Sequence, residues 1–498
     1  MFFGRVKPLD QILATAEKKS LKRQLGPVQL TLLGIGAIIG TGIFVLTAEA
    51  GQKAGPAMMI AFIIAAIVCA LAALAYAELA AMVPVSGSAY TYTYAVFGEG
   101  LAWVVGWALV LEYAVAAGAV AVGWSGYVNG LLASAGHGLP EALQTGPYDG
   151  GAFNLLAFSI SLVITGLLVL GTSKSAWVNA ALVAIKVIAL VIFIIIALPA
   201  AKDPNFQPFM PTGYNGVFAA AASIFFAYVG FDAVSTAAEE TKNPNRNIPI
   251  GLIGSLAVCT VFYLLVGYAV VGAGGAQPMF GADGIALSPG TPEMTAACQA
   301  STELVCSNEP LAHVLKMLGF AGWGNFIGFA ASIALPSVIL MMIFGQTRIF
   351  FVMSRDGLLP NVLSKVHTKY HTPHVVTIIT GVAVSLFAAM FPVGILADIS
   401  NAGTLFAFLM VALGVLILRR TQPDRARPFR TPMAWVICPL AIAGCAFLFY
   451  SLSGRVPFPY VGTVSTQMFF VIWAAIGLVI YGLYGYRKSH LANGTEAN

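Results

Sequence analysis

The feature that most constrains this chain is a glycine-rich run inside its first long apolar segment. The run reads Gly34-Ile35-Gly36-Ala37-Ile38-Ile39-Gly40-Thr41-Gly42-Ile43-Phe44. Because glycine destabilises a helix interior, a membrane-spanning helix that carries this run is expected to break near its middle. Inside a bilayer, backbone outside a helix is tolerated only where it is buried in protein or lines a cavity. The run therefore predicts a binding site at the centre of a membrane helix.

The composition predicts an all-α integral membrane protein. Hydrophobic residues make up 59% of the 498 residues, charged residues make up 9%, and the mean hydropathy is +0.86. Apolar windows of roughly 17–25 residues are long enough to cross a bilayer. Twelve such windows are expected to be transmembrane helices, at 28–48, 56–82, 99–132, 152–171, 175–199, 215–238, 248–273, 322–354, 374–391, 395–418, 432–453 and 463–486. Residues 1–26 are polar and charged, so no cleavable signal peptide is expected.

The distribution of basic residues predicts the orientation of these helices. Twenty of the 25 Lys and Arg residues lie before the first span, after the last, in the connections on that same side or, in the case of Arg348, near that end of a span. Four lie in connections on the other side, and Lys186 lies inside a span. By the positive-inside rule both termini are expected in the cytoplasm and the chain in the plasma membrane. The net charge of +5 thus reflects topology, and no nucleic-acid partner is expected.

The order of the spans predicts two repeats of opposite orientation. The sixth span is interrupted at Phe225-Phe226-Ala227-Tyr228-Val229-Gly230-Phe231-Asp232, in the place that corresponds to the glycine run of the first span. Broken first helices in two oppositely oriented halves are typical of five-plus-five inverted-repeat transporters. The expected divisions are a cytoplasmic segment 1–27, a first repeat 28–199, a second repeat 215–418 with the outside loop 274–321, two extra helices within 432–486, and a cytoplasmic tail 487–498.

Six cysteines carry little functional signal. Four of them, Cys69, Cys259, Cys438 and Cys445, lie in spans and are interpreted as small core residues. Cys298 and Cys306 share the outside loop, where a disulfide and two free thiols are equally compatible with the sequence.

Several motifs together resemble the amino acid–polyamine–organocation superfamily, and within it bacterial members of the cationic amino acid transporter family. Some members of that family have fourteen spans, whereas twelve are expected here. The motifs cover spans 1 to 10 in order and are Gly34–Phe44, Tyr76–Leu79 with Pro84–Tyr90, Gly106–Tyr113, Phe225–Asp232 with Glu239–Pro244 and Ile248-Pro249, and Arg348–Gly357. The resemblance implies an amino acid transporter, with Phe226 as an aromatic gate over the substrate.

The two breaks provide a partner for each charged end of an amino acid. Backbone N–H groups at Gly40, Thr41 and Gly42 suit the carboxylate, because the second half-helix begins there with its positive end. Carbonyl groups of Ile38, Phe226 and Val229 can accept hydrogen bonds from the ammonium. The alternative is that Gly36-x-x-x-Gly40 only allows close helix packing. The additional glycines, Thr41 and the matching break in span 6 favour binding.

Lys186 is a single amine deep in the apolar fifth span. Placing such a charge in a bilayer costs at least about 2.5–3.5 kcal/mol. Burial lowers the proton affinity of a lysine and brings it closer to the physiological range. The resemblance implies the same role, because proton-coupled members have a lysine here where sodium-coupled relatives bind a cation. The alternative is a permanently charged lysine paired with Glu112 or Asp232.

Six further polar residues lie at membrane depth. Glu112 and Asp232 could take part in a proton relay or contact a cationic substrate, and structural hydrogen bonds are an equal alternative. The predicted proton-coupling group also contains Ser332 and Ser337 of span 8. Asn401 and Thr404 of span 10 are predicted to contact the substrate side chain, although such residues also link helices structurally.

No catalytic or metal-binding pattern is found, so neither an enzyme nor a bound metal or cofactor is expected. None of the histidines lies in a span together with partner ligands, and His367, His371 and His374 are interpreted as a solvated cytoplasmic face. The predicted function is proton-coupled import of L-amino acids. The alternatives are an ion-translocating subunit of an energy-converting complex, an exchanger without proton coupling, and a channel. The expected partners are the amino acid, protons and the lipid bilayer; the sequence predicts no oligomeric state and no accessory subunit.

Overall fold

The computed structural model describes residues 5–9, 25–84, 88–171, 176–237, 241–370, 372–458 and 462–493. Most of the predicted N-terminal segment, the last residues of the tail, the motif residues 85–87 and 239–240, and His371 lie outside this description. The described chain is almost entirely helical, as predicted. Its two strands are β1 (Arg455–Phe458) and β2 (Gly462–Ser465), which pair antiparallel.

Within the described residues, eight helical stretches are long and apolar enough to cross a membrane. They are Leu46–Met82, Glu99–Ser134, Ala180–Ala200, Pro244–Gly274, Ala321–Arg355, Val393–Thr421, Ala434–Ser451 and Thr466–Lys488. Predicted spans 1 and 6 are divided into shorter pieces. Predicted spans 4 and 9 correspond to helices of 16 and 17 residues. The all-helical membrane fold is therefore confirmed, whereas the count of twelve spans stays a prediction.

The helices follow one another in the order of the predicted spans. In the first part of the chain they are α2 (Pro27–Ile38), α3 (Thr41–Phe44), α4 (Leu46–Ala54), α5 (Met58–Met82), α6 (Ser88–Val96), α7 (Glu99–Ser134), α8 (Leu155–Leu170) and α9 (Ala176–Ala197). In the middle they are α10 (Gly213–Ile224), α11 (Ala233–Thr236), α12 (Pro244–Gly274), α13 (Pro292–Gln299), α14 (Pro310–Met317), α15 (Ala321–Ala334) and α16 (Pro336–Arg355). The last are α17 (His374–Met390), α18 (Val393–Thr421), α19 (Ala434–Ser451), α20 (Thr466–Ile480), α21 (Tyr486–Lys488) and α22 (His490–Asn493).

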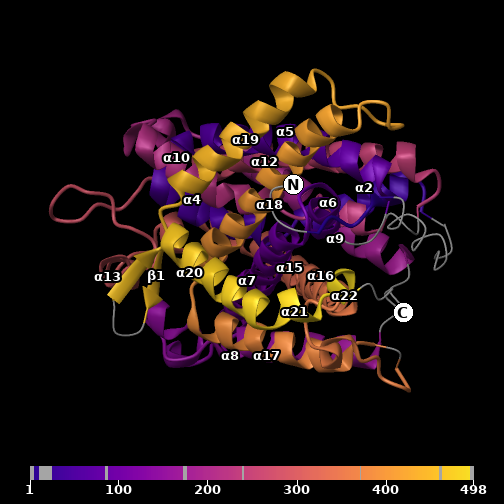
Figure 1. The fold of residues 1–498 in the computed structure, drawn as a ribbon. Coiled ribbons are helices and arrows are strands. Elements are labelled where there is room, and N and C mark those ends of the chain that lie inside the picture. Colours follow the sequence, from indigo (N-terminus) through magenta and orange to yellow (C-terminus); the bar gives the residue numbers. More distant parts are fainter. Residues whose placement is uncertain are drawn as a thin grey trace.

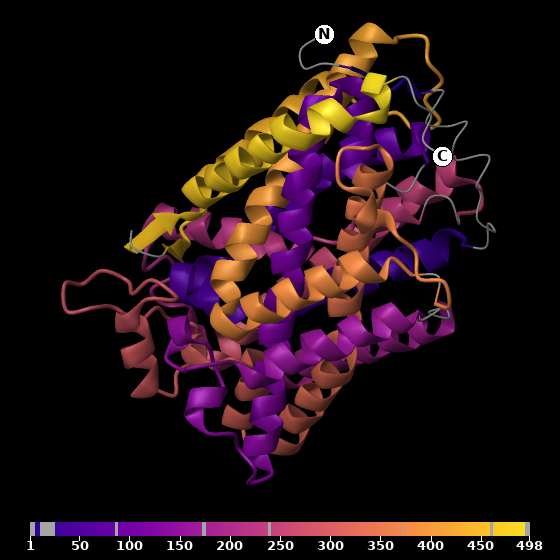
Figure 2. The ribbon, with the colours of Figure 1, turned by 60° about the horizontal axis from the view of Figure 1, so that its bottom comes forward.

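Helix α7 runs through the centre of the bundle, and α8 and α17 lie side by side across one side of it (Figure 1). Residues 5–9 and 486–493 lie at one end, here called the termini face, and the loop 275–309 lies at the opposite end, called the loop face (Figure 2). Small residues allow helices to approach closely. A Cβ added to Gly403 of α18, for example, would lie 3.0 Å from the carbonyl oxygen of Ala108 in α7.

Two indoles join α20 to α7. The Nε1 group of Trp107 donates to the carbonyl of Trp473 at 2.9 Å, and the Nε1 group of Trp473 donates to the carbonyl of Trp107 at 2.9 Å. The two rings are stacked with centroids 4.6 Å apart. A buried indole N–H needs an acceptor, and here each one finds it on the partner helix.

The loop-face segment is attached to α4 by one buried side chain. Gln52 donates to the carbonyls of Met279 and Leu287 at 2.9 and 2.8 Å and accepts from the backbone N–H of Met279 at 2.8 Å. A disulfide joins Cys298 and Cys306 in the same segment, which decides between the two alternatives that the sequence left open. The loop thus packs on the outer part of the first interrupted helix.

Candidate functional site

The first interrupted helix breaks at the predicted glycines. Helix α2 ends at Ile38, and extended backbone at Ile39 and Gly40 separates it from α3. Gly40 has φ −146° and ψ −151°, and α3 begins at Thr41. The N–H groups in the first turn of a helix have no acceptor within that helix. The break therefore directs backbone donors, at the positive end of α3, toward the interior of the bundle.

The second break lies between α10 and α11. A short 3₁₀ turn at Phe225–Tyr228 is followed by extended backbone at Val229 and by Gly230 with φ +111°, which favours glycine. A Cβ on Gly230 would also lie 3.0 Å from the carbonyl oxygen of Ala37, at the end of α2. The second break thus needs a glycine for its conformation and for its contact with the first break.

The two breaks contact each other directly. A Cβ added to Gly42 would lie only 2.3 Å from the Cα atom of Ala227. Tyr263 of α12 also joins them, since its hydroxyl lies 2.9 Å from the carbonyl oxygen of Ile38 and 2.8 Å from that of Ala227. A hydroxyl carries one proton, so the two carbonyls share it.

A small cavity lies where the two breaks meet. Its lining combines the predicted binding residues with apolar side chains from α7 and α16. The lining residues are Ala37, Ile38, Gly40, Thr41, Gly42, Val120, Phe226, Val229, Val338 and Met342. Six of the eight residues predicted to bind substrate therefore surround one space.

Thr41 brings an unused polar group to this cavity. Its side chain is fully buried, and its Oγ1 has no hydrogen-bond partner in the described part of the chain. Gly123 of α7 leaves room for it, because a Cβ there would lie 2.5 Å from the Thr41 methyl group. Leaving a buried hydroxyl unpaired costs free energy, roughly 1–3 kcal/mol. A polar ligand in the cavity would supply the missing partner.

The other two predicted substrate contacts lie away from the cavity lining. Asn401 donates through Nδ2 to the carbonyls of Ala222 and Ser223, at 2.8 and 3.1 Å. Thr404 donates to the carbonyl of Ser400 at 3.2 Å. In this conformation Asn401 connects α18 to α10, whereas the Thr404 bond stays within α18. The contact of both residues with substrate stays a prediction.

Lys186 contacts the backbone next to the first break. Its side chain is 1% exposed, and its Nζ donates to the carbonyl of Gly36 at 2.8 Å. Ser332 and Ser337 donate to the carbonyls of Gly328 and Ala334 in their own helical segments. The lysine thus stabilises the end of α2, only two residues before the cavity-lining Ile38.

Glu112 and Asp232 lie in a buried polar region between α7, α18 and the second break. The Tyr113 hydroxyl is 3.4 Å from Oδ2 of Asp232, and Ser400 donates to the backbone carbonyl of Glu112. Oε2 of Glu112 is buried without a hydrogen-bond partner among the described residues. Neither acid lines the cavity.

The structure adds an ion-pair network that the sequence analysis missed. Lys53 of α4 lies 2.6 Å from Glu49 and 3.4 Å from Asp398 of α18, and Ser223 of α10 donates to Asp398 at 2.5 Å. Burial, together with the charge of Glu49, raises the pKa of Asp149 in the neighbouring loop to about 6. The network connects α4 of the first interrupted helix and α10 of the second to α18.

Tyr263 and Tyr113 were also missed, because tyrosine counts as an ordinary aromatic residue in an apolar helix. Their hydroxyls form hydrogen bonds with partners 36 to 225 residues away in the sequence, so no local pattern identifies them.

In the described part of the chain, no group of three His, Cys, Asp or Glu side chains is arranged to hold a metal ion.

A membrane bundle in which two interrupted helices meet at a buried cavity defines a membrane transport protein. The chain belongs to the amino acid permease family, whose model matches residues 25–483. It is 45% identical to the branched-chain amino acid permease BcaP of Bacillus subtilis (strain 168), over 97% of each chain. It is 41% identical to the methylthioribose transporter of the same organism, over 98% of this chain and 99% of that one. It is 34% identical to the vacuolar cationic amino acid transporter 2 of Arabidopsis thaliana, over 84% of this chain and 63% of that one.

Proposed function

We propose that this protein imports L-amino acids across the plasma membrane by alternating access, in symport with protons and with both termini in the cytoplasm. The observation that carries the proposal is the cavity at the two breaks, where backbone donors and acceptors face one space. An amino acid presents one anionic and one cationic group. The two helix breaks offer complementary partners for both.

The carboxylate is proposed to bind the N–H groups of Gly40, Thr41 and Gly42 together with the Thr41 hydroxyl. This arrangement would provide a partner for the buried Oγ1 that has none. The ammonium is proposed to donate to the carbonyls of Ile38, Phe226 and Val229. A carbonyl oxygen has two lone pairs, so Ile38 can accept from both Tyr263 and the substrate.

The substrate side chain is proposed to be apolar and branched. The wall opposite the breaks consists of Val120, Val338 and Met342, and neither Glu112 nor Asp232 lines it. A cationic side chain placed there would lose its hydration without gaining a partner, which is costly. The relatives include two permeases for branched-chain amino acids, from Bacillus subtilis and Lactococcus lactis, which agrees with this choice.

Proton coupling is proposed to depend on Lys186. When it is protonated, its contact with the Gly36 carbonyl holds α2 against α9, and span 8 hydroxyls at Ser332 and Ser337 complete the arrangement. When it is deprotonated, the contact weakens and the site can open inward. A group couples a gradient to a conformational change only if its proton affinity differs between the two states. Glu112 and Asp232 are the next candidates.

The function is tested by uptake of labelled leucine into proteoliposomes that contain only the purified protein. An inward proton gradient should drive accumulation into vesicles without internal amino acid, and a protonophore should abolish it. Valine and isoleucine should compete, whereas arginine and methylthioribose should not. Uptake that requires internal amino acid would contradict symport and favour exchange, and competition by arginine would contradict the apolar side-chain preference.

Replacing Phe226 by alanine is expected to slow transport more than it weakens binding. The Phe226 carbonyl remains, but the ring that closes the cavity is lost, so closure over the substrate should be impaired. We expect the uptake rate to fall by about tenfold or more while the leucine Kd changes less. Phe225→Ala is the matched control, because Phe225 packs against Phe408 and does not line the cavity. Equal transport losses in the two variants would reject the gate role.

A further inference from the structure

Five of the 25 basic residues of this chain lie within the twelve positions 419–430, in the last turn of α18 and in the connection that follows it toward α19. They are Arg419, Arg420, Arg425, Arg427 and Arg430. The segment lies at the termini face, at the end of two membrane helices (Figure 2). Asp424 is its only acidic residue. The segment therefore carries a strong local excess of positive charge. Four of its arginines fall into two groups, whereas Arg425 donates to the side chain of Gln422.

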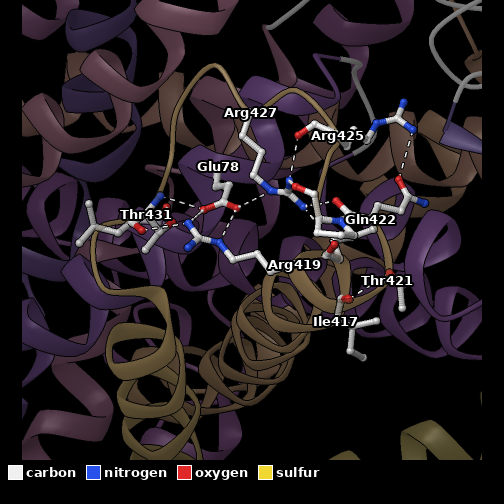
Figure 3. Close-up of polar contacts among 11 residues, drawn as sticks. Glu78, Ile417, Arg419, Thr421, Gln422, Arg425, Arg427 and Thr431 are labelled. Carbon is white, nitrogen blue, oxygen red and sulfur yellow. Dashed lines mark hydrogen bonds and ion pairs between the residues drawn. The ribbon is translucent and has the colours of Figure 1, made fainter.

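The first group, Arg419 and Arg427, forms internal ion pairs with Glu78 near the end of α5 (Figure 3). Arg419 donates to Glu78 through Nε at 3.0 Å and through Nη2 at 2.7 Å. The Nε atom of Arg427 lies 3.3 Å from the same carboxylate, which also accepts from the backbone N–H of Thr431 at 2.8 Å. A carboxylate that is 1% exposed needs such partners.

These contacts also fix the course of the segment. Arg427 donates to the carbonyls of Leu418 and Gln422, and Arg419 donates to that of Thr431 (Figure 3). The backbone before Thr431 is therefore held next to the last turn of α18. The chain segments that carry Arg420 and Arg430 are therefore held next to each other, although the two residues lie ten positions apart in the sequence.

The second group consists of Arg420 and Arg430, which are both exposed. Arg420 follows the anchored Arg419, and Arg430 precedes the anchored Thr431. In the part of the chain that the structure describes, neither has an ion pair with a carboxylate. The guanidinium carbon of Arg420 lies 5.0 Å from the ring centre of Trp435, whose side chain is 51% exposed at the start of α19.

We propose that Arg420, Arg430 and Trp435 form a binding site for the headgroup of an anionic phospholipid. A guanidinium stacked on an aromatic ring keeps its N–H edges available, and its planar fork matches a phosphate group. Tryptophan favours the interfacial region of a bilayer, where the headgroups lie. Clusters of arginine next to the end of a membrane helix are attracted to anionic lipids. The assignment of this site to the cytoplasmic leaflet depends on the proposed orientation, with both termini in the cytoplasm. The site itself does not depend on it.

A lipid held here would act on the helix that approaches the substrate site. Helix α18 runs without interruption from Asn401, next to the second break, to Arg420. With a rise of about 1.5 Å per residue, the two positions are about 28 Å apart along the helix. The headgroup would thus hold the termini-face end of α18 against α19 and restrict its tilt.

The test is native mass spectrometry of the full chain with added phosphatidylglycerol or phosphatidylcholine. The wild type should retain phosphatidylglycerol in preference to phosphatidylcholine, and the preference should weaken as ionic strength rises. The double variant Arg420→Gln/Arg430→Gln should lose at least about tenfold in phosphatidylglycerol affinity, equivalent to about 1.4 kcal/mol. The control Lys365→Gln/Lys369→Gln removes the same charge from exposed positions in the loop between α16 and α17 and should keep wild-type affinity.

Equal losses in the two double variants would show that only net charge matters and would overturn the site. Absence of a phosphatidylglycerol preference in the wild type would overturn it as well. Melting temperatures show whether each double variant is folded. If Arg420→Gln/Arg430→Gln is not folded, the single variant Arg430→Gln is measured instead. Native mass spectrometry measures bound lipid and needs no transport. The lipid site can therefore be confirmed or rejected even if the proposed amino acid uptake is not observed.

Discussion

Lys186→Met is expected to abolish proton-driven accumulation of substrate. The variant keeps side-chain length and apolar volume but cannot titrate or donate to the Gly36 carbonyl. Accumulation in proteoliposomes across a pH gradient should fall to the level reached without a gradient. Exchange of internal for external leucine should persist, because the cavity itself is intact. Persisting exchange would also show that the variant is folded.

Two further variants separate the alternatives for this lysine. Lys186→Arg keeps a permanent positive charge, since arginine does not deprotonate in proteins. If Lys186 acts by titrating, the arginine variant should fail as well, whereas a permanently charged structural lysine would be replaced successfully. A methionine variant that concentrates leucine as the wild type does would reject the proposal, and Glu112→Gln and Asp232→Asn would then be measured in the same assay.

Gly42→Ala is expected to weaken substrate binding strongly. Its Cβ would lie 2.3 Å from the Cα atom and 3.0 Å from the backbone nitrogen of Ala227, so backbone must move rather than a flexible side chain. Overpacking of this kind costs about 1–3 kcal/mol. The two breaks would separate and distort the donors and acceptors around the cavity. We expect the leucine Kd to rise by about tenfold or more, since 1.4 kcal/mol corresponds to a factor of ten.

Gly40→Ala is the matched control for Gly42→Ala. The nearest atom to a Cβ at Gly40 is Cγ2 of Val338 at 3.6 Å, an ordinary contact, and its backbone is extended. Its melting temperature should equal that of the wild type, while that of Gly42→Ala should fall. Binding measured by calorimetry decides the outcome: a Gly42→Ala variant with wild-type affinity would show that the contact between the breaks is not needed for the site.

The sequence predicted the features that local backbone chemistry determines. Glycines at 40 and 42 identified the first break, and Gly230 with its aromatic neighbours identified the second. Both interruptions were predicted because helix stability depends on residues within a few positions. The sequence analysis inferred that both breaks contribute to one binding site. Six of the predicted residues accordingly line one cavity.

The remaining parts of the site depend on contacts between distant segments. No local pattern predicts the pairing of Lys53 with Asp398, because it requires that α4 and α18 lie side by side. The disulfide was undecided because the approach of Cys298 and Cys306 depends on how the chain reverses after α13. Asn401 and Thr404 were predicted from their depth in the membrane, whereas the direction of a side chain depends on the rotation of its helix.

The reciprocal indole bonds between Trp107 and Trp473 make α20 a reporter of the central helix. Breaking either bond would leave a buried polar group without a partner, so α20 is expected to follow α7 in every conformation. A spin label on the exposed Met468 or Val471 of α20 would therefore mark a fixed frame of reference. Distances from that frame to labels on α4 or α10 would measure the movement of each interrupted helix directly, without contributions from tumbling of the whole bundle.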